Sequence, residues 1–496
     1  MGKKKSVVLM TLLTIVIVVL CAITAFPAFS FPGKSVKKWN PAVLQYDLGM
    51  DLGGGYYTYY YPEGVISATE YENNLAEKTD EEKEEYIDSY FNPAGSSLYF
   101  SNDEDKNIVV DGAIAEDFTA AFNAAAKEIE ARYAAMGYSD YSVSIVDGYA
   151  IKVELPASEL NAGQVFSSFM ITDEVTMKMG GEVIDALKSK EASISDLIKN
   201  VTVAEQYGVA YLKFHFTKEG REVLNDLKES LSISTNGDSE PVTLDIVVGE
   251  TTLATIYQDH ITDANVAKVP MAYVENKAYV EMAAVLVNSL VSVGSFDIQF
   301  RTLATSDIRV FAPVYGEKVM TMIFIAVAIV IAAVIALSIV KMGRFGGVSA
   351  YLNASYLIVV GLCYAFIAKG VFEITLGSVL VFLAGLALMN ILQLVVYKAV
   401  KAEFQLGKTV ESSVKAGYNK TLWTVVDVYA VLLLASLALL IGGAGVYTLA
   451  LQALICVITG AFCNLLWGRF INFTFLSASK NKYEYFRFVR EDDDDE

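Results

Sequence analysis

Long apolar runs alternate with polar segments along the chain and mark six candidate membrane spans. Each run is about 20 residues long, which is the length that a helix needs to cross the hydrocarbon core of a bilayer. The predicted spans are Ser6–Phe26, Val319–Val340, Ala350–Ile367, Ile374–Val396, Leu422–Ile441 and Val446–Trp467. One span precedes a long polar region and five follow it, so the pattern predicts an α-helical polytopic membrane domain with a large insertion between spans one and two.

Basic residues gather before the first span, after the second, after the fourth and in the tail. They are Lys3, Lys4, Lys5, Lys341, Arg344, Lys398, Lys401, Lys408, Lys415, Lys420, Arg469, Lys480, Lys482, Arg487 and Arg490. Because lysine and arginine accumulate on the cytoplasmic side of membrane proteins, we expect both termini in the cytoplasm and the region Pro27–Glu317 outside it. We expect the first run to be retained as a span, although a cleaved signal peptide is the alternative interpretation.

The second half of the outer region, residues 201–317, shows strand-like alternation and helical spacing in turn. Its predicted elements, in the order β-α-β-β-α-β, are Ala210–Phe216, Lys218–Leu231, Val242–Val248, Thr252–Tyr257, Glu275–Val293 and Phe296–Thr302. This order is typical of the ferredoxin-like α+β arrangement. We therefore predict a second ferredoxin-like extracytoplasmic module over residues 201–317.

The first half of the outer region, residues 27–200, follows a related pattern. Its predicted elements are the strand Tyr56–Tyr61, the helix Phe118–Met136, a hairpin of Tyr141–Ile145 and Ala150–Leu155 around Asp147-Gly148, the helix Ala162–Phe169 and the strand Glu174–Met179. An acidic insertion over residues 67–106 interrupts it, and we expect a solvated segment there. The predicted domains are thus 1–26, 27–200, 201–317, the five-helix membrane domain 318–470 and an acidic cytoplasmic tail 471–496.

Charge separates the outer region from the rest of the chain. Residues 31–317 hold 46 acidic and 21 basic side chains, whereas the remainder holds 11 acidic and 17 basic ones. The acidic balance argues against a nucleic-acid partner, which needs a basic surface. The 54% hydrophobic content excludes a disordered chain.

The residues needed for metal or nucleotide chemistry are not arranged in a recognisable site. Only two histidines occur, His215 and His260, and all four cysteines lie in predicted spans. A zinc site needs three or four ligands, so we expect no metal and no cofactor. The sequence also has no Gly-x-x-x-x-Gly-Lys-Ser/Thr motif, so we expect a transport component without its own ATPase rather than an enzyme.

Three stretches form a more specific pattern. The first is Leu48-Gly-Met-Asp-Leu-Gly-Gly-Gly55, just after span one. The second joins the segments Ala124–Tyr138 and Gly148–Pro156, and the third runs from Gly407 through Gly417 to Asp427. Together with the order of the spans, these stretches resemble the SecD/SecF family of protein-export membrane subunits, which belongs to the resistance-nodulation-division-like superfamily.

The resemblance implies a function in protein export at the cell membrane. It implies an accessory subunit of the Sec translocase, in which the outer domain grips an unfolded preprotein and proton motive force resets it. The implied partners are a SecF-like subunit, a SecYEG-type translocon, the preprotein and the lipid bilayer, with no nucleic acid. No residue that contacts the preprotein is assigned by the resemblance, and Gln164 on the predicted helix Ala162–Phe169 is not singled out by it.

Two of the motifs predict local structure. Gly53, Gly54 and Gly55 allow positive φ or close backbone approach at the start of the first strand, and we expect Asp51 to accept hydrogen bonds from the turn amides. Residues 407–427, which include the motif residues Gly407 and Gly417, form an amphipathic cytoplasmic segment that leads into span five.

Asp427 is the candidate for proton coupling because it lies about five residues inside the fifth predicted span. An acidic side chain within a span suggests ion or proton traffic, a hydrogen bond between helices, or an interfacial position. In the family the fourth span usually carries an Asp with an Asn two residues later, whereas this sequence has Ile391 and Gln393 there, next to Asn390. We expect Asn390, Gln393 and Asp427 to form a hydrogen-bonded amide–carboxylate cluster between spans four and five.

Two other functions agree with the same sequence pattern. A resistance-nodulation-type exporter of lipids or small molecules shares the six-span plan and ferredoxin-like outer modules, but it generally has two such halves and charged residues in the fourth span. A non-energised scaffold for the translocon agrees with the missing fourth-span acid.

Overall fold

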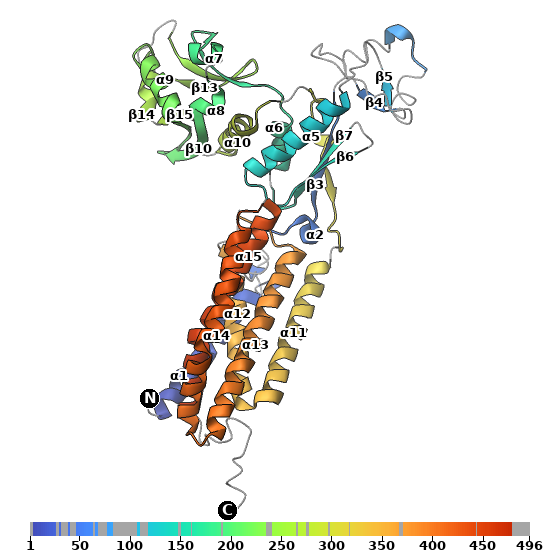
Figure 1. Ribbon diagram of the computed structural model, residues 1–496. Helices are drawn as coiled ribbons and strands as arrows, with labels where there is room; N and C mark the ends of the chain where they lie inside the picture. Colours follow the sequence, from blue (N-terminus) through green and yellow to red (C-terminus); the bar gives the residue numbers. More distant parts are fainter. Residues whose placement is uncertain are drawn as a thin grey trace, which may run out of the picture. The chain divides into compact units, whose positions relative to one another are not determined.

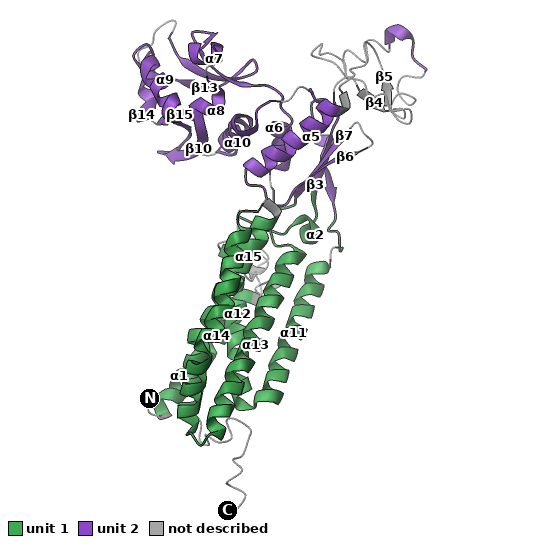
Figure 2. Cartoon of the chain, in the orientation of Figure 1, with its two compact units in different colours: residues 1–55, 156–158, 312–496 green, residues 56–155, 159–311 purple. Residues whose placement is uncertain are grey.

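The computed structural model divides into two compact units (Figure 2). It describes residues 3–25, 29–30, 38–39, 46–62, 65–67, 77–82, 107–109, 118–146, 150–159, 161–189, 192–234, 241–263, 266–273, 277–295, 298–316, 318–366, 371–442 and 444–478. The helical unit comprises residues 1–55, 156–158 and 312–496, and the sheet unit comprises residues 56–155 and 159–311. Most of the predicted acidic insertion, the turn at Asp147-Gly148 and residues 479–496 of the predicted tail lie outside the described residues.

The helical unit contains six helices that are long and apolar enough to cross a membrane, among the residues described (Figure 1). They are α1 (Lys3–Ala25), α11 (Val319–Met342), α12 (Arg344–Phe366), α13 (Leu376–Gln405), α14 (Val410–Leu439) and α15 (Ala444–Phe462), the last continuing through a π-helical turn (Cys463–Trp467) into α16 (Gly468–Ala478). The six predicted spans are confirmed as membrane-capable helices. Each of the six begins earlier or ends later than its apolar run, and in α12, α13 and α14 polar turns continue the helix.

Glycine and threonine residues set the ends of these helices. Gly343 has φ +63° between α11 and α12, and Gly407 has φ +90° after α13, where a side chain would be strained. The hydroxyls of Thr375 and Thr409 accept hydrogen bonds from the amides of Ser378 and Ser412 at the starts of α13 and α14. The boundaries of α13 and α14 therefore follow from local capping rather than from hydropathy alone.

One sheet of the sheet unit has the strand order β16-β3-β7-β6. Its strands are β3 (Gly55–Tyr60), β6 (Ser142–Val146), β7 (Ala150–Pro156) and β16 (Arg309–Phe311), and the helices α5 (Phe118–Ala135) and α6 (Ala162–Phe169) belong with it. The core between this sheet and the two helices includes the buried side chains of Tyr60, Phe122, Tyr133, Phe166 and Phe169. Along the chain the order is β-α-β-β-α-β.

The last strand of this sheet differs from the prediction. The predicted strand Glu174–Met179 forms as β8 (Val175–Met179) but belongs to another sheet, and β16 closes this one. β16 has three residues, too few for alternation to mark it, and it reaches the sheet only after the chain has built a further lobe. The predicted strand Phe296–Thr302 is also wrong for its described residues, 298–302, where an isolated bridge joins Phe300 to Pro62.

That further lobe contains two four-stranded sheets, ordered β10-β11-β15-β14 and β13-β12-β8-β9. The strands are β8 (Val175–Met179), β9 (Glu182–Val183), β10 (Ile198–Gln206), β11 (Val209–Phe216), β12 (Leu244–Val248), β13 (Thr251–Ile256), β14 (Ile261–Asp263) and β15 (Val266–Tyr273). The helices α9 (Lys218–Lys228) and α10 (Lys277–Val293) pack with them, and their apolar side chains form one core.

The predicted module 201–317 is therefore wrong in its strand pairing. β11 pairs with β10 and β15, whereas β12 and β13 pair with each other and β12 also pairs with β8. Both β8 and the start of β10 precede residue 201, so the sheets draw strands from either side of the predicted boundary. The remaining short elements are β1 (Phe29–Ser30), β2 (Lys38–Trp39), α2 (Met50–Gly53), β4 (Val65–Ser67), β5 (Asn107–Val109), α7 (Asp185–Lys188), α8 (Ile194–Leu197), and the 3-10 turns Gln258–His260 and Thr305–Asp307.

Candidate functional site

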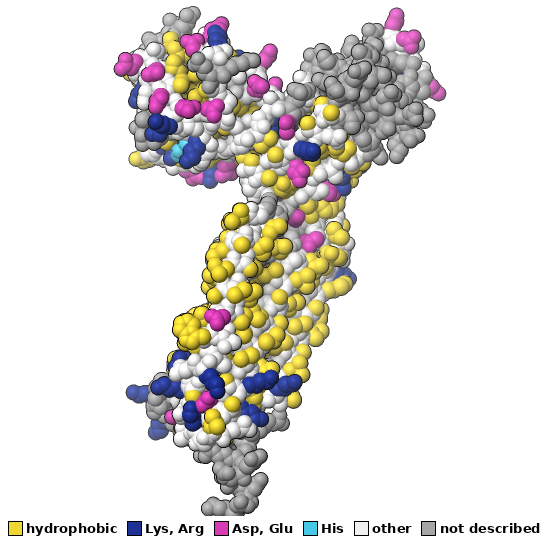
Figure 3. All heavy atoms as spheres, in the orientation of Figure 1, with side chains coloured by type: hydrophobic (Ala, Val, Ile, Leu, Met, Phe, Trp, Pro, Cys, Tyr) yellow, Lys and Arg dark blue, Asp and Glu magenta, His cyan; other side chains and the backbone are white. Residues whose placement is uncertain are grey.

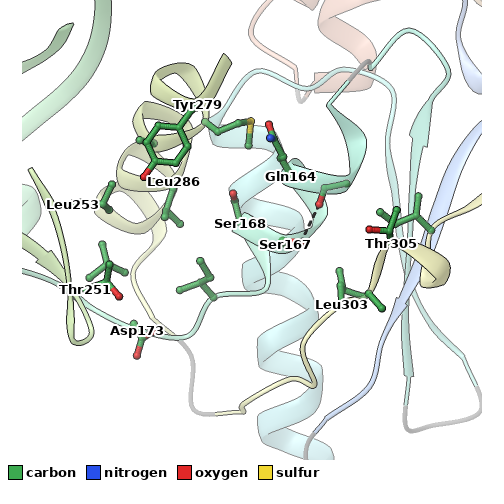
Figure 4. Close-up of a pocket in the computed structure, with 17 residues that line it drawn as sticks. Gln164, Ser167, Ser168, Asp173, Thr251, Leu253, Tyr279, Leu286, Leu303 and Thr305 are labelled. Carbon is green, nitrogen blue, oxygen red and sulfur yellow. Dashed lines mark hydrogen bonds between the residues drawn. The ribbon is translucent and has the colours of Figure 1, made fainter. Parts of the chain in front are cut away.

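A cleft of about 650 Å³ opens in the sheet unit beside α6 and α10 (Figure 4). Its walls come from α6, α10, β13, the segment after α6 and the segment 303–308. The lining residues are Gly163, Gln164, Ser167, Ser168, Ile171, Asp173, Val248, Thr251, Leu253, Tyr279, Met282, Ala283, Leu286, Leu303, Ala304, Thr305 and Ile308. The cleft thus lies between the β16-β3-β7-β6 sheet with its helices and the two-sheet lobe, all within one compact unit.

The cleft combines apolar surface with hydrogen-bonding groups. Tyr279 is 62% exposed on α10, and Leu286 lines the cleft from the same helix. Across from them α6 presents Gln164 and Ser168, and its Ser167 hydroxyl donates to the carbonyl of Gly163 at 3.0 Å (Figure 4). Such a surface suits a ligand with apolar side chains and a polar backbone, and it offers no cluster of charges for a small ionic substrate.

Arg132 fixes both chain connections beside this cleft. Its side chain is fully buried on α5, where Nη1 donates to the carbonyls of Phe169 and Ile171 at 2.9 and 2.6 Å. Nη2 donates to the carbonyl of Gly294 at 2.5 Å. Those carbonyls lie where the chain enters the two-sheet lobe after α6 and where it leaves after α10. Burial lowers the pKa of the guanidinium to about 10, against the opposing charge of Glu128, so the group is still cationic at neutral pH.

In the helical unit, the predicted cluster of Asn390, Gln393 and Asp427 does not form. Asn390 on α13 instead exchanges amide hydrogen bonds with Asn353 on α12, at 3.1 and 2.8 Å. Its Nδ2 also donates to the carbonyl of Leu386 at 2.8 Å. The amides of Asn353 and Asn390 satisfy each other, so the acid of span five has no role in this contact.

Gln393, three residues after Asn390 on α13, is fully buried. It lies beside the Tyr418 hydroxyl but makes no hydrogen bond of good geometry within the described residues. Nearby, Nδ2 of Asn464, in the π-helical turn, donates to the carbonyl of Met389 at 3.1 Å and to the Tyr429 hydroxyl at 2.8 Å. The interior of the helical bundle around α13 is therefore lined by neutral amides and phenols.

Asp427 lies on the surface of α14 and is exposed. The helix buries Val425 and Tyr429 on its inner side, so the periodicity turns residue 427 away from the bundle. The prediction that Asp427 faces Asn390 and Gln393 is wrong because the rotation of α14 about its own axis turns residue 427 outward.

The Asp51 motif binds a helix rather than its own turn. Oδ2 of Asp51 accepts a hydrogen bond from the backbone amide of Leu376 at 2.7 Å, in the first turn of α13. Backbone bonds reinforce the contact: the amide of Gly49 donates to the carbonyl of Ile374 at 3.0 Å, and the amide of Ile374 donates to that of Asp47 at 2.7 Å. The expected bonds from the glycine amides to Asp51 are not formed. The motif instead ties the chain before β3 to the start of α13.

The glycines of the same motif have different roles. A Cβ at Gly53 would lie 2.9 Å from Cβ of Leu48, so this position needs close approach. Gly54 has φ +69°, and Gly55 begins β3 with no positive φ. The predicted structural turn is present, and the positive φ falls on Gly54 alone of the three.

Gly407 and Gly417 shape the hairpin between α13 and α14. The positive φ of Gly407 ends α13, as given above. A Cβ at Gly417 would lie 2.3 Å from Cγ2 and 2.8 Å from Cα of Val400, so the two helices meet almost backbone to backbone. Beside this contact, the Glu403 carboxylate forms ion pairs with Lys408 and Lys420, at N–O distances of 2.5 and 3.2 Å.

Comparison with known proteins gives one sequence relative and a matching fold. No family model matches the sequence. The chain is 24% identical over 178 residues to the protein translocase subunit SecD of Borreliella burgdorferi, a match that covers 36% of this chain and 30% of that protein. A crystal structure of SecDF in a super-membrane-facing form has a TM-score of 0.55 at 16% identity, covering 96% of this chain and 58% of that one. A structure of SecDF from Thermus thermophilus covers 97% of this chain and 60% of that one at 17% identity, and its TM-score of 0.41 is too low for a fold argument.

The chain therefore spans less than two thirds of the relatives that it matches. The SecDF structure shows the fold, and the SecD match is independent of it because it rests on sequence. The six membrane-capable helices among the described residues and the sheet-containing unit agree with this fold. The chain is thus a multi-pass membrane protein that is similar to SecD in sequence and to SecDF in fold.

Proposed function

We propose that this chain is an accessory subunit of a Sec-type protein translocase, assisting preprotein export on the outer side of the cell membrane. The observation that carries the proposal is the open cleft beside α6 and α10 in a chain with this fold. The sequence relative from Borreliella burgdorferi is named as a protein translocase subunit, which supports the same assignment.

An unfolded preprotein segment is the ligand that suits the cleft. Its apolar side chains match Leu253, Leu286 and Leu303, while its backbone amides and carbonyls match the side chains of Gln164 and Thr305. Binding that relies on apolar area and backbone groups tolerates many sequences, as an export factor requires. An exposed tyrosine such as Tyr279 adds area at a low cost in side-chain entropy.

The orientation in the membrane is part of the proposal. Lysine and arginine side chains gather around one end of the helical unit, below a surface covered by apolar side chains (Figure 3). By the positive-inside rule this end is cytoplasmic. Both termini are then cytoplasmic and the sheet unit is extracytoplasmic, where its β-α-β-β-α-β sheet acts as the ferredoxin-like base of the outer domain.

The partners are also part of the proposal. The SecDF chain extends well beyond the part that this chain covers, and we propose that a SecF-like half completes the assembly beside a SecYEG-type translocon. In this assembly we propose Asp427 as the acidic side chain for proton coupling, because it lies within the apolar part of α14 while Asn390 and Gln393 of α13 are neutral amides.

A non-energised scaffold is the second candidate, and the pairing of Asn353 with Asn390 favours it. An amide pair does not titrate near neutral pH, so it cannot carry a proton through α13. Asp427→Asn separates the two candidates. Proton coupling predicts slower export that no longer responds to collapse of the proton gradient, whereas a scaffold predicts unchanged export with an unchanged response.

Export measured in cells tests the proposal itself. Depletion of the chain is expected to slow the conversion of secreted precursors to their mature forms, and wild-type protein restores it. A variant with a charge in the cleft, Leu286→Asp, is expected to be inserted in the membrane but not to restore export. The matched change Val310→Asp, at a residue 74% exposed away from the lining, is expected to restore it. Normal export after depletion would exclude the function.

A further inference from the structure

The outward face of α14 carries one acidic residue in an otherwise apolar stripe. Trp423, Val431 and Leu434 are 71%, 66% and 65% exposed, and Asp427 lies between them at spacings of three and four residues. Such spacings place the four side chains on one helix face. Ala438 continues the face, and Lys420 begins it. We refer to these six residues as the α14 face.

Asp427 lies within the apolar part of the helix. It follows Lys420 by seven residues, which is about 10 Å along the helix axis. Trp423, one turn before it, is of the type that sits at the membrane–water interface. An aspartate side chain is too short to reach the interface from this depth, in contrast to lysine or arginine.

Nothing in the described part of the chain neutralises this acidic side chain. No hydrogen bond or ion pair joins Asp427 to another described residue. Acidic side chains within membrane helices normally face the bundle or a partner, because lipid offers them no donor. The neighbouring bundle groups are taken: Asn390 pairs with Asn353, and Asn464 binds Tyr429.

We infer that the α14 face is a docking surface for a transmembrane helix of a different protein, which brings a basic or hydrogen-bond-donating side chain to Asp427. The inference deepens the proposed function and rests on it for the existence of a partner half. Apolar side chains on either side of Asp427 supply the packing area, and the small Ala438 permits close approach of the helices.

Charge complementarity decides between the alternative occupants. A second copy of this chain, related by a two-fold axis through the face, would set Asp427 against Asp427 with no donor between the two acids. Lipid tails cover the apolar residues of the face but provide nothing for the acid. A partner helix with a donor at the same depth satisfies both the apolar stripe and Asp427.

Photocrosslinking in intact membranes tests the α14 face. A photoreactive amino acid replaces Val431, and the matched control replaces Ile329, which is 63% exposed on α11 at a similar distance from the basic end. The expected result at Val431 is an adduct with a transmembrane helix of another protein that carries a donor side chain within one turn of the attachment site. The Ile329 control does not give this adduct.

Substitution at Asp427 then tests the chemistry. Asp427→Leu is expected to lower the adduct yield about fivefold, as loss of one interhelical hydrogen bond would, whereas Asp427→Asn lowers it by less than about twofold because the amide keeps an acceptor. Replacement of the donor in the captured helix should reproduce the effect of Asp427→Leu without adding to it. Both variants must insert and purify as the wild type does.

Three results would overturn the inference. They are adducts with lipid alone, adducts with a second copy of this chain, and a partner adduct whose yield is unchanged by Asp427→Leu. Export assays keep the two proposals apart. An intact α14-face adduct in a chain that has no effect on export would contradict the proposed function only, and export that depends on the chain without the adduct would contradict the docking surface only.

Discussion

Asp51 and Arg132 both bind backbone groups that are far away along the chain. Asp51 accepts from Leu376, and Arg132 donates to carbonyls that follow α6 and α10. The sequence predicted a structural role for Asp51 but assigned it the nearest amides, and it gave no reason to select Arg132. A lone arginine in a helix resembles any solvated one until tertiary structure buries it, so pattern analysis cannot find such a residue.

Removal of the Arg132 guanidinium tests its role at the connections beside the cleft. In Arg132→Met the carbonyls of Phe169, Ile171 and Gly294 lose charged donors while the methylene volume is kept. We expect the free energy of local opening to fall by roughly 3 kcal/mol. Amide hydrogen exchange of residues 165–174 and 290–295 measures it. Arg309→Met, at an exposed residue, is the control, and equal exchange in the two variants would refute the role.

His260 predicts a pH dependence of the sheet unit. Burial lowers the pKa of its imidazole below the ordinary value, against the nearby charge of Asp259, and Nδ1 accepts a hydrogen bond from the amide of Tyr257 at 3.3 Å. Since the unfolded chain binds the proton more readily, this contribution is present above the unfolded pKa of about 6.5 and is lost as pH falls towards the folded pKa.

Chemical denaturation at about pH 7.5 and about pH 5, on either side of the ordinary histidine pKa, checks this expectation. The wild type should lose more stability than His260→Gln on acidification, and the difference between the two proteins isolates the imidazole from the carboxylates. Parallel pH profiles for the two proteins would show that His260 does not contribute.

At the scale of elements, the helices of the helical unit were predictable and the sheets only in part. Hydropathy over about 20 residues is a local signal, so the six membrane-capable helices could be located from sequence, although their ends could not. Strand pairing is nonlocal. Alternation found β11, β12 and β13, but it did not show that β11 joins β10 and β15, and the three-residue β16 gave no signal.

Addition of a single methyl group at Gly417 tests the close contact of α13 with α14. In Gly417→Ala the new Cβ collides with Val400, including its backbone, so the helices must separate. We expect the helical unit to lose about 1–3 kcal/mol of stability. Gly347→Ala on α12 is the matched control, because a Cβ there meets nothing within 4 Å. Thermal unfolding of the full chain in detergent compares them, and equal unfolding temperatures would contradict the close contact.

For the whole molecule, the net charge of the chain combines two different regions. The outer region holds most of the acidic residues, while basic residues dominate the remainder. The structure divides the chain accordingly, into a sheet unit with a cleft and a bundle with neutral polar groups around α13. The cleft could not be predicted because it forms where α6, α10, β13 and residues 303–308 meet, and these segments are far apart in sequence.

Direct capture of an exported polypeptide tests the central claim that the cleft binds preproteins. A photoreactive amino acid at Tyr279, in the cleft, is compared with one at Tyr207, which is 93% exposed in the turn between β10 and β11. With a secreted precursor stalled during export, we expect adducts with the precursor at Tyr279 and far fewer at Tyr207. Equal labelling at both positions, or labelling at neither while the precursor is demonstrably in transit, would contradict the account.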